Sequence, residues 1–472
     1  MLDDVPLGLA QILAQAGVPF CQRVGGGGEG RFVLFDSRRG ISHPPGYGQT
    51  AIDVDCLRDS TEADPFELLC GEQSRPKQWE IAGWTVTEKV AEVDRRAVRR
   101  RVLDQLREEI EQAGGVWVCV SPFPFPYRSA FNLRIDHSRY DADQFHAALL
   151  ALADGERAVT HVIGGDAFEP HADALARLQG LDVGSRGYRG EVYTTERENL
   201  KNVRRGLETL RAARLNPSGF AAPGGRFHRS LLSALEKLEI SHSSEVGLAY
   251  DELPFFPQAS DVLQMPVHPV GFDSFLRTPS RETPPSSATQ RAVHATIDYF
   301  RDTARSKYRA GEPVFFHGES TGVLVGYPQL LHAVFDTVGA FGAIWKTTLT
   351  EYADWWRARA AVRLSVVREG DHYVVHSDYH PREYRVGIEY SRGRHVARMR
   401  LKGNLLRFSP SALAYENRTS LPSVNPVRID PPEGLRGLVR RWVEPGEKNG
   451  SNEAISDSWR DRAKRAFRRL HG

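Results

Sequence analysis

The sequence contains few cysteines, and none of them lies in a Cys-x-x-Cys pattern. All four fall in roughly the first quarter of the chain: Cys21, Cys56, Cys70 and Cys119. This number and spacing exclude the usual zinc-binding signatures and a disulfide framework. We therefore expect buried free thiols.

Long hydrophobic runs are also missing. No stretch approaches the about 20 apolar residues that a membrane-spanning helix needs. Residues 1–17 carry two early aspartates and a helical apolar pattern, not the basic start and apolar core of a signal peptide. These absences predict a cytoplasmic protein.

The chain has almost no net charge. Its 62 basic and 60 acidic residues give a formal charge of +2, so the field of the whole protein does not favour nucleic acid as a partner. With 472 residues, 40% of them hydrophobic, the chain is long enough to bury the cores of roughly two to four domains.

Residues 1–125 are predicted to form an N-terminal α/β region. The pattern favours helices at 5–16 and 90–113 and strands at 31–35 and 116–120. The glycine run at 25–30 lacks the flanking strand and helix and the Gly-Lys-Ser/Thr ending of a phosphate-binding loop, which favours a flexible turn. Alternating prolines at 121–128 mark the end of this region.

From residue 126 to 360 strand and helix patterns alternate. Strands are predicted at 130–135, 159–163, 181–183, 219–222, 262–265 and 313–316, and helices at 143–152, 169–178, 195–210, 229–238, 292–307 and 329–338. The helix from 195 has the most specific signal, because Thr195 and Glu198 form a capping box. The alternation predicts a β/α barrel or a wound sheet.

The stretch at 180–200 is the strongest candidate for a site within this barrel. A short strand is followed by a glycine-rich loop at 184–190 and then by the capped helix. In α/β proteins the carboxyl ends of the strands carry the chemistry. The loop contains Arg186 and Arg189 but no cysteine, histidine or carboxylate.

Several short motifs, in this order, resemble those of the polysaccharide deacetylases, the NodB-type carbohydrate esterases. They are Asn-Leu-Arg-Ile-Asp at 132–136, Gly-Ser-Arg-Gly-Tyr-Arg-Gly at 184–190, Phe-Ala-Ala-Pro-Gly-Gly-Arg at 220–226, Ser-Ser-Glu at 243–245 with Pro-Phe-Phe-Pro at 254–257, Leu-Gln-Met-Pro-Val-His-Pro at 263–269 and Phe-Phe-His at 315–317. The resemblance covers roughly residues 131–357. It implies a distorted β/α barrel and hydrolysis of N-acetyl groups on amino sugars, with a zinc-like metal held by one aspartate and two histidines.

The resemblance places a base-like carboxylate at Asp136, but it does not supply the metal ligands. The metal-binding aspartate falls at or near Ser138, and the two histidines, four residues apart, fall on Arg186 and Gly190. An arginine cannot be deprotonated to bind a metal, and its charge would repel one. The third motif puts an arginine at Arg226 and the last a histidine at His317, with Glu319 two residues later.

Other residues near the same strand ends leave alternatives open. A relocated metal could use some of His137, Asp141, His161, Asp166 and His171. We favour a site without a relocated metal, because His137 should point to the opposite face of its strand from Asp136 and because His161 stands among apolar residues.

The candidate site residues also have structural interpretations. Asp136 could be a strand-end carboxylate tied to loop amides or to Arg134, and His317 a hydrogen-bonded histidine at the barrel mouth. For Arg186 an ion pair with Asp136 is favoured over binding of a substrate carboxylate or phosphate. Aromatic residues could line a sugar groove, although such residues are more often core: Tyr188, Tyr193, Tyr250, Phe255 and Phe256.

The sequence pattern changes after residue 360. Short alternating strands at 361–425 predict a small antiparallel β-sandwich. Residues 426–472 are predicted to be a linker and a basic amphipathic tail, which could bind an anionic membrane surface or dock on its own protein. Docking on its own protein is favoured over the membrane, and nucleic acid is the weakest alternative.

Two classes of function follow. We favour a degenerate deacetylase-like protein of cell-surface polysaccharide metabolism that binds a carbohydrate without a metal, with Asp136 and His317 at the catalytic positions and Arg186, Tyr188 and Arg226 binding the ligand. The alternative is an active hydrolase of N-acetyl groups on amino sugars, with a rebuilt site and a divalent metal such as zinc.

Overall fold

The computed structural model describes residues 2–3, 5–20, 32–38, 49–57, 74–81, 84–91, 95–225, 228–245, 253–257, 260–276, 287–377 and 383–417. All of them belong to one compact unit, Met1–Val427. The glycine turn at 25–30, the tail at 426–472, Arg226 and Tyr250 lie outside the described residues, so the predictions made for them stay predictions.

The main sheet is parallel, as the alternating pattern predicts. Its order is β12-β11-β10-β9-β8-β7-β13, and β14 pairs with the first part of β7. The strands are β7 (Ser129–His137), β8 (Val159–Ile163), β9 (Asp182–Ser185), β10 (Gly219–Phe220), β11 (His242–Ser243), β12 (Leu263–Gln264), β13 (Val314–Glu319) and β14 (Ile344–Lys346).

The two edges of this sheet approach each other after β12. The amide of His268 donates to the carbonyl of Phe315 in β13 at 2.8 Å. This contact lies beyond the end of β12, so β12 and β13 do not pair as strands. The sheet is therefore curved into a barrel that is not closed by strand pairing between its two edges. The fold is therefore a distorted β/α barrel.

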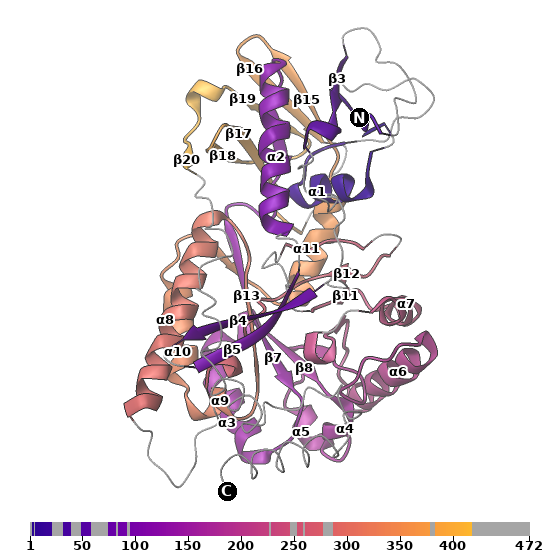
Figure 1. The fold of residues 1–472 in the computed structure, drawn as a ribbon, viewed down its shortest axis with the longest axis vertical. Helices are drawn as coiled ribbons and strands as arrows, with labels where there is room; N and C mark the ends of the chain where they lie inside the picture. The colour runs from indigo at the N-terminus through magenta and orange to yellow at the C-terminus, as the bar shows by residue number, and fades with distance from the viewer. Residues whose placement is uncertain are drawn as a thin grey trace, which may run out of the picture. The chain divides into compact units, whose positions relative to one another are not determined.

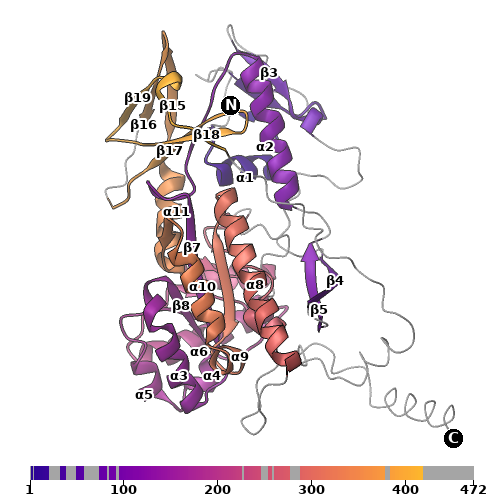
Figure 2. The same cartoon turned by 90° about the vertical axis from the view of Figure 1, so that its left-hand side faces the viewer.

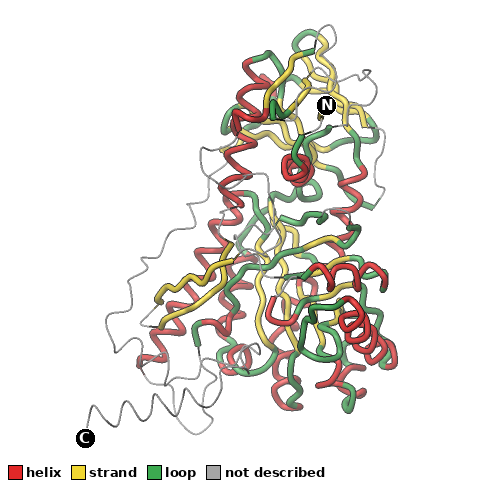
Figure 3. Tube along the Cα trace, turned by 45° about the vertical axis from the view of Figure 1, so that its right-hand side comes forward, coloured by secondary structure: helices red, strands yellow, loops and turns green. Residues whose placement is uncertain are grey.

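Helices cover the outside of the barrel (Figures 1 and 3). They are α3 (Ala142–Leu152), α4 (Gly165–Phe168), α5 (Ala172–Ala176), α6 (Glu196–Ala212), α7 (Arg229–Lys237), α8 (Ser287–Ala310), α9 (Val323–Gly326), α10 (Gln329–Gly339) and α11 (Leu349–Ala361). Figure 2 shows α8 and α10 side by side along the strands, where they bury the largest apolar cluster against β7 and β13. No helix among the described residues is long and apolar enough to cross a membrane.

The capped helix forms where the sequence places it. In α6 the hydroxyl of Thr195 accepts a hydrogen bond from the amide of Glu198, and the apolar stripe Val203, Leu207 and Leu210 is buried. The helix predicted at 169–178 is wrong in its bounds. The structure has two short helices there, α4 before residue 169 and α5 after residue 171. Only α5 falls within the predicted range.

The N-terminal region contains a small parallel sheet. Its order is β1-β2-β3, and it packs with α1 and α2 around one apolar cluster. The elements are β1 (Leu2–Asp3), α1 (Leu7–Ala16), β2 (Phe32–Phe35), β3 (Thr50–Asp53), β4 (Ser74–Ile81), β5 (Trp84–Ala91), α2 (Arg95–Gln112) and β6 (Trp117–Val120). The helix predicted from residue 90 begins only at Arg95, because the alternating Thr and Val residues before it form β5, which pairs with β4.

Two antiparallel sheets follow the barrel, as predicted for an antiparallel C-terminal part. One has the order β15-β16-β19 and the other β20-β18-β17-β6. Their strands are β15 (Leu364–Glu369), β16 (His372–Ser377), β17 (Gly387–Arg392), β18 (His395–Arg400), β19 (Leu405–Phe408) and β20 (Glu416–Asn417). Because β6 comes from the N-terminal region, that region and the C-terminal part share one sheet.

An arginine joins these parts. Arg359 in α11 is 3% exposed and donates to the carbonyls of Ser121 (3.0 Å), Ala14 (3.1 Å), Gln15 (2.9 Å) and Val120 (3.2 Å). These carbonyls belong to α1 and to the end of β6. The barrel helix α11 is thereby fixed to the N-terminal region.

Candidate functional site

The candidate site lies where β7 and β13 end. In β7 alternate side chains point inward, so Asn132, Arg134 and Asp136 share the interior face. Register pairs Arg134 with His317 and Asp136 with Glu319 in the neighbouring parallel strand. The carboxyl ends of two adjacent strands therefore bring four ionisable side chains to one place.

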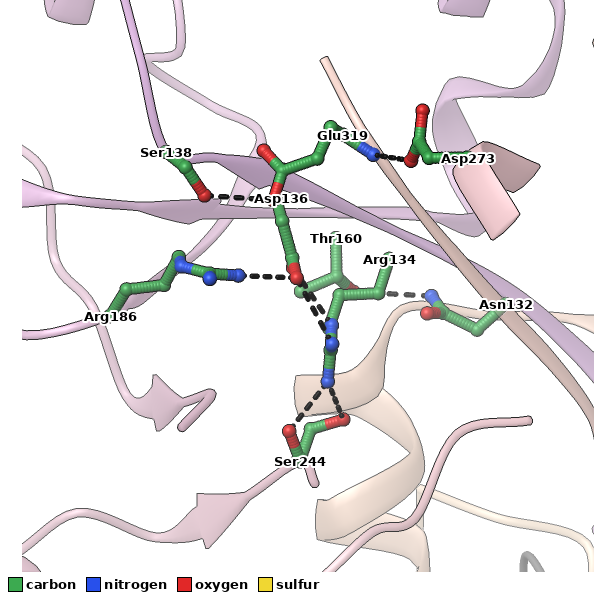
Figure 4. Close-up of polar contacts among 9 residues, drawn as sticks. All are labelled: Asn132, Arg134, Asp136, Ser138, Thr160, Arg186, Ser244, Asp273 and Glu319. Carbon is green, nitrogen blue, oxygen red and sulfur yellow. Dashed lines mark hydrogen bonds and ion pairs between the residues drawn. The ribbon is translucent and has the colours of Figure 1, made fainter. Parts of the chain in front are cut away.

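Asp136 receives hydrogen bonds from two arginines (Figure 4). Arg134 donates to both of its oxygens, from Nε to Oδ1 at 2.9 Å and from Nη2 to Oδ2 at 3.1 Å, while Arg186 donates from Nη1 to Oδ2. Burial raises the pKa of Asp136, but the charges of Arg134 and Arg186 outweigh it and lower that pKa to about 2. Asp136 is consequently a carboxylate at neutral pH and a weak base.

All three nitrogens of the Arg134 guanidinium donate hydrogen bonds within the protein. Its Nη1 donates to the carbonyl of Ser244 at 2.5 Å and to the hydroxyl of Ser244 at 3.0 Å, and its side chain is 2% exposed. Ser244 follows β11, so this arginine spans the barrel interior. Its role is to hold Asp136 and to join β7 to the end of β11.

Arg186 comes from the glycine-rich loop, directly after β9. Its amide donates to the carbonyl of Ile163 at 2.8 Å, and Gly187 follows it with a φ of 81°, a backbone angle that glycine adopts easily. The side chain is 9% exposed and points at Asp136. The predicted ion pair between Arg186 and Asp136 is therefore confirmed.

His317 lies beside Arg134 and carries no charge at neutral pH. Burial, followed by the charge of Arg134, lowers the pKa of His317 to about 3. Its Nε2 is buried and has no hydrogen-bond partner among the described residues. A Cβ at Gly271 would lie 2.7 Å from the imidazole, so this glycine makes room for the ring.

Two further carboxyl groups border the cluster. Burial and the charge of Asp136 raise the pKa of Glu319, whose Oε1 accepts from the Ser138 hydroxyl at 2.8 Å. Burial also raises the pKa of Glu245 to about 7; its Oε1 accepts from Ser243 and its Oε2 has no partner in the described chain. Glu245 was not singled out as a site residue, although it stands two residues after the carboxyl end of β11.

The residues present do not fit the metal that the family resemblance implies. Ser138 is engaged with Glu319, Arg186 brings a positive charge to Asp136, and Gly190 is exposed and has no side chain. Within the described ranges no three histidine, cysteine or carboxylate side chains are grouped as metal ligands.

Two of the histidines considered for a relocated metal, His137 and His161, lie on the other face of the sheet, whereas His171 is exposed before α5. His137 Nε2 and His161 Nδ1 are 2.9 Å apart, and both rings are buried, with Phe145 and Phe168 against His137. Burial lowers the pKa of His161 to about 4 and that of His137 well below its usual range. The prediction that His137 points away from Asp136 is confirmed.

Tyr188 lies at the surface between α4 and α6. Its hydroxyl donates to Glu169 at 2.6 Å and accepts from Arg205 at 2.7 Å, and the Arg205 guanidinium stacks 3.6 Å from the ring. Its predicted role in sugar binding, like that of Arg226, stays a prediction.

A surface cavity of about 780 Å³ lies at the opposite ends of the strands. It is lined by residues that precede β11 and β12 and by α11, among them Ser241, Asp261 and Arg357. The cavity is at the amino ends of these strands, whereas Asp136 is at the carboxyl end of β7. It is therefore separate from the candidate site.

No protein-family model and no curated protein sequence matches this chain. The solved structures include a putative polysaccharide deacetylase from Mycobacterium smegmatis, 16% identical over 53% of this chain and 98% of its own, with a TM-score of 0.44. A probable polysaccharide deacetylase from Pseudomonas aeruginosa is 13% identical over 50% and 94%, with a TM-score of 0.40.

A CE4-family pseudoenzyme from Bacillus anthracis is 14% identical over 50% of this chain and 70% of its own, with a TM-score of 0.32. These values are too low to transfer a function, so the fold assignment rests on the strand order and register of this chain. That fold is the distorted β/α barrel which the resemblance of its motifs to the NodB-type deacetylases implies.

Proposed function

We propose that this chain is a polysaccharide-deacetylase-like protein that binds a carbohydrate at the carboxyl ends of β7, β9 and β13 and does not hydrolyse it. The observation that carries the proposal is the ion pair between Arg186 and Asp136. The guanidinium supplies a fixed positive charge at the position that the resemblance gives to a metal ligand.

The protonation states of the site support binding over hydrolysis. Amide hydrolysis needs a base for the attacking water and an acid for the leaving amine. With a pKa of about 2, Asp136 is a poor base, and with a pKa of about 3, His317 is a neutral imidazole at pH 7 and not the imidazolium that would protonate a leaving amine. That the ligand is a carbohydrate is inferred from the motifs shared with the deacetylases and from the hydrogen-bonding side chains at the candidate site.

One observation favours the alternative, a hydrolase with a rebuilt site. Glu245 has a pKa raised by burial to about 7, and its Oε2 lacks a partner in the described chain. A carboxyl group with that pKa exchanges protons near neutral pH.

A cytoplasmic location, and contact of the C-terminal tail with anionic membranes, stay proposals that rest on the sequence alone.

The experiment separates binding from turnover on one preparation. Protein purified without chelator is mixed with N-acetylglucosamine oligomers; binding is followed by NMR titration and deacetylation by acetate release. We expect binding without acetate release, and binding weakened by Arg186→Ala but not by Arg189→Ala, an exposed arginine of the same loop. Acetate release that is lost in Glu245→Gln would establish the hydrolase instead.

A further inference from the structure

Arg186 has more hydrogen-bond donors than the protein uses. A guanidinium carries five N–H groups. Arg186 bonds Asp136 from Nη1, and within the described chain no hydrogen bond leaves its Nε or Nη2. Neither nitrogen is among the fully buried polar atoms without a partner, so this edge of the guanidinium keeps part of the 9% of the side chain that is exposed.

This partly exposed edge is the one that recognises carboxylates. Nε and Nη2 lie side by side and can donate two parallel bonds to the two oxygens of one carboxylate. Arg134 uses this same edge on Asp136, with bonds of 2.9 and 3.1 Å. The site thus already contains one example of the geometry, and Arg186 has a second edge of the same kind.

Asp136 is the one carboxylate that is hydrogen-bonded to the two arginines of the cluster within the described chain. Arg134 and Arg186 bring two positive charges, and Asp136 neutralises one of them. Glu319 is the internal competitor, but it is bonded to Ser138, no hydrogen bond joins it to Arg186 in the described chain, and burial raises its pKa. An external carboxylate could form the two parallel hydrogen bonds to Arg186 that Glu319 does not form.

We infer that the site recognises an acidic sugar, with the ligand's carboxylate bound by the Nε and Nη2 donors of Arg186. The inference rests on the proposed carbohydrate function and names the substrate class of that site.

The test compares two sugars that differ only in the carboxylate, methyl β-D-glucuronide and methyl β-D-glucoside. Affinities are measured by NMR titration of the full chain and of two variants. We expect the glucuronide to bind about 10-fold more tightly than the glucoside, because its carboxylate forms charge-assisted hydrogen bonds. In Arg186→Lys the charge remains but the planar fork is lost, and the preference should fall below about 3-fold.

A second variant keeps the inference testable if Arg186→Lys does not fold. Glu319→Gln removes the internal competitor and retains the oxygen that accepts from Ser138, so the glucuronide should bind several-fold more tightly. Equal binding of the two sugars, or a preference unchanged in Arg186→Lys, would overturn the acidic-sugar inference and leave the proposed function intact. Inorganic phosphate that competes as well as the glucuronide would overturn the carboxylate assignment, and failure of every saccharide would overturn the proposed function.

Discussion

At the scale of single residues, Arg134 and Arg186 contact the same carboxylate but have different tasks. Arg134 makes two bonds to Asp136 and two to Ser244, whereas Arg186 makes one bond to Asp136. The first arginine is thus a structural tie across the barrel. The second makes one bond to Asp136, so its removal leaves Asp136 paired, and it is the group to which we assign ligand binding.

This difference predicts unequal stability losses in two matched variants. Arg134→Met should lower the free energy of unfolding by about 3 kcal/mol or more, because Asp136 stays buried with one partner and Ser244 loses its donor. Arg186→Met should cost about half as much, since Asp136 keeps its bidentate partner. Urea unfolding followed by circular dichroism measures both; equal losses, or a larger loss for Arg186→Met, would contradict these roles.

The buried histidine pair predicts a pH dependence. Burial lowers the pKa of His161 to about 4, against about 6.5 in an unfolded chain, so the unfolded state binds protons more readily. The stability that neutral His161 contributes is complete above about pH 6.5 and is lost as the pH falls toward 4.

Between pH 7 and pH 5 the native chain should therefore lose on the order of 2 kcal/mol more stability than His161→Gln. Glu245, whose pKa is raised to about 7, contributes with the opposite sign but is present in both chains and cancels in the comparison. Urea midpoints at the two pH values measure the difference, and parallel losses in the two proteins would show that His161 is not held neutral.

At the scale of elements, α11 connects the barrel to the N-terminal region through Arg359. This side chain is the donor for carbonyls of Ala14, Gln15, Val120 and Ser121. Next to it, Gly17 has a φ of 68°, and a Cβ there would lie 2.2 Å from the Val120 carbonyl oxygen. The junction is closely packed and depends on one guanidinium.

Arg359→Met should lower the free energy of unfolding by about 3 kcal/mol, because buried carbonyls lose their donors. Arg363→Met, two residues beyond α11 and exposed, should change it by less than about 0.5 kcal/mol. Limited proteolysis should then cleave the Arg359→Met variant faster near residues 14–20. Resistance equal to that of Arg363→Met would refute a structural role for Arg359.

At the scale of the whole molecule, local sequence patterns predicted the barrel. They did not predict the contacts between residues far apart in the sequence. The capping box at Thr195 and the alternation of strands and helices depend on neighbouring residues, so they could be recognised in the sequence. The pairing of β6 with β17 joins residues about 270 positions apart, and no local periodicity encodes it. The ion pair of Arg186 with Asp136 was predictable because family motifs placed both residues at strand ends.

Glu245 shows the limit of prediction at the site. Its raised pKa depends on burial inside the barrel, which its own segment of sequence does not reveal. Likewise, the four bonds of Arg134 could be seen only once the barrel had brought Ser244 opposite β7. Motif order thus located the site, and the fold determined its charge states.

The position of Arg186 can be tested directly by metal titration. Cobalt(II) is added to chelator-treated native chain and to the variant Ser138→Asp/Arg186→His/Gly190→His, and bound metal is measured by elemental analysis after gel filtration. If Arg186 replaces a metal ligand, the native chain should retain well below one cobalt per chain, and the variant should retain more because it regains three ligand side chains. One cobalt bound per native chain, with no gain in the variant, would contradict the replacement of the metal by Arg186.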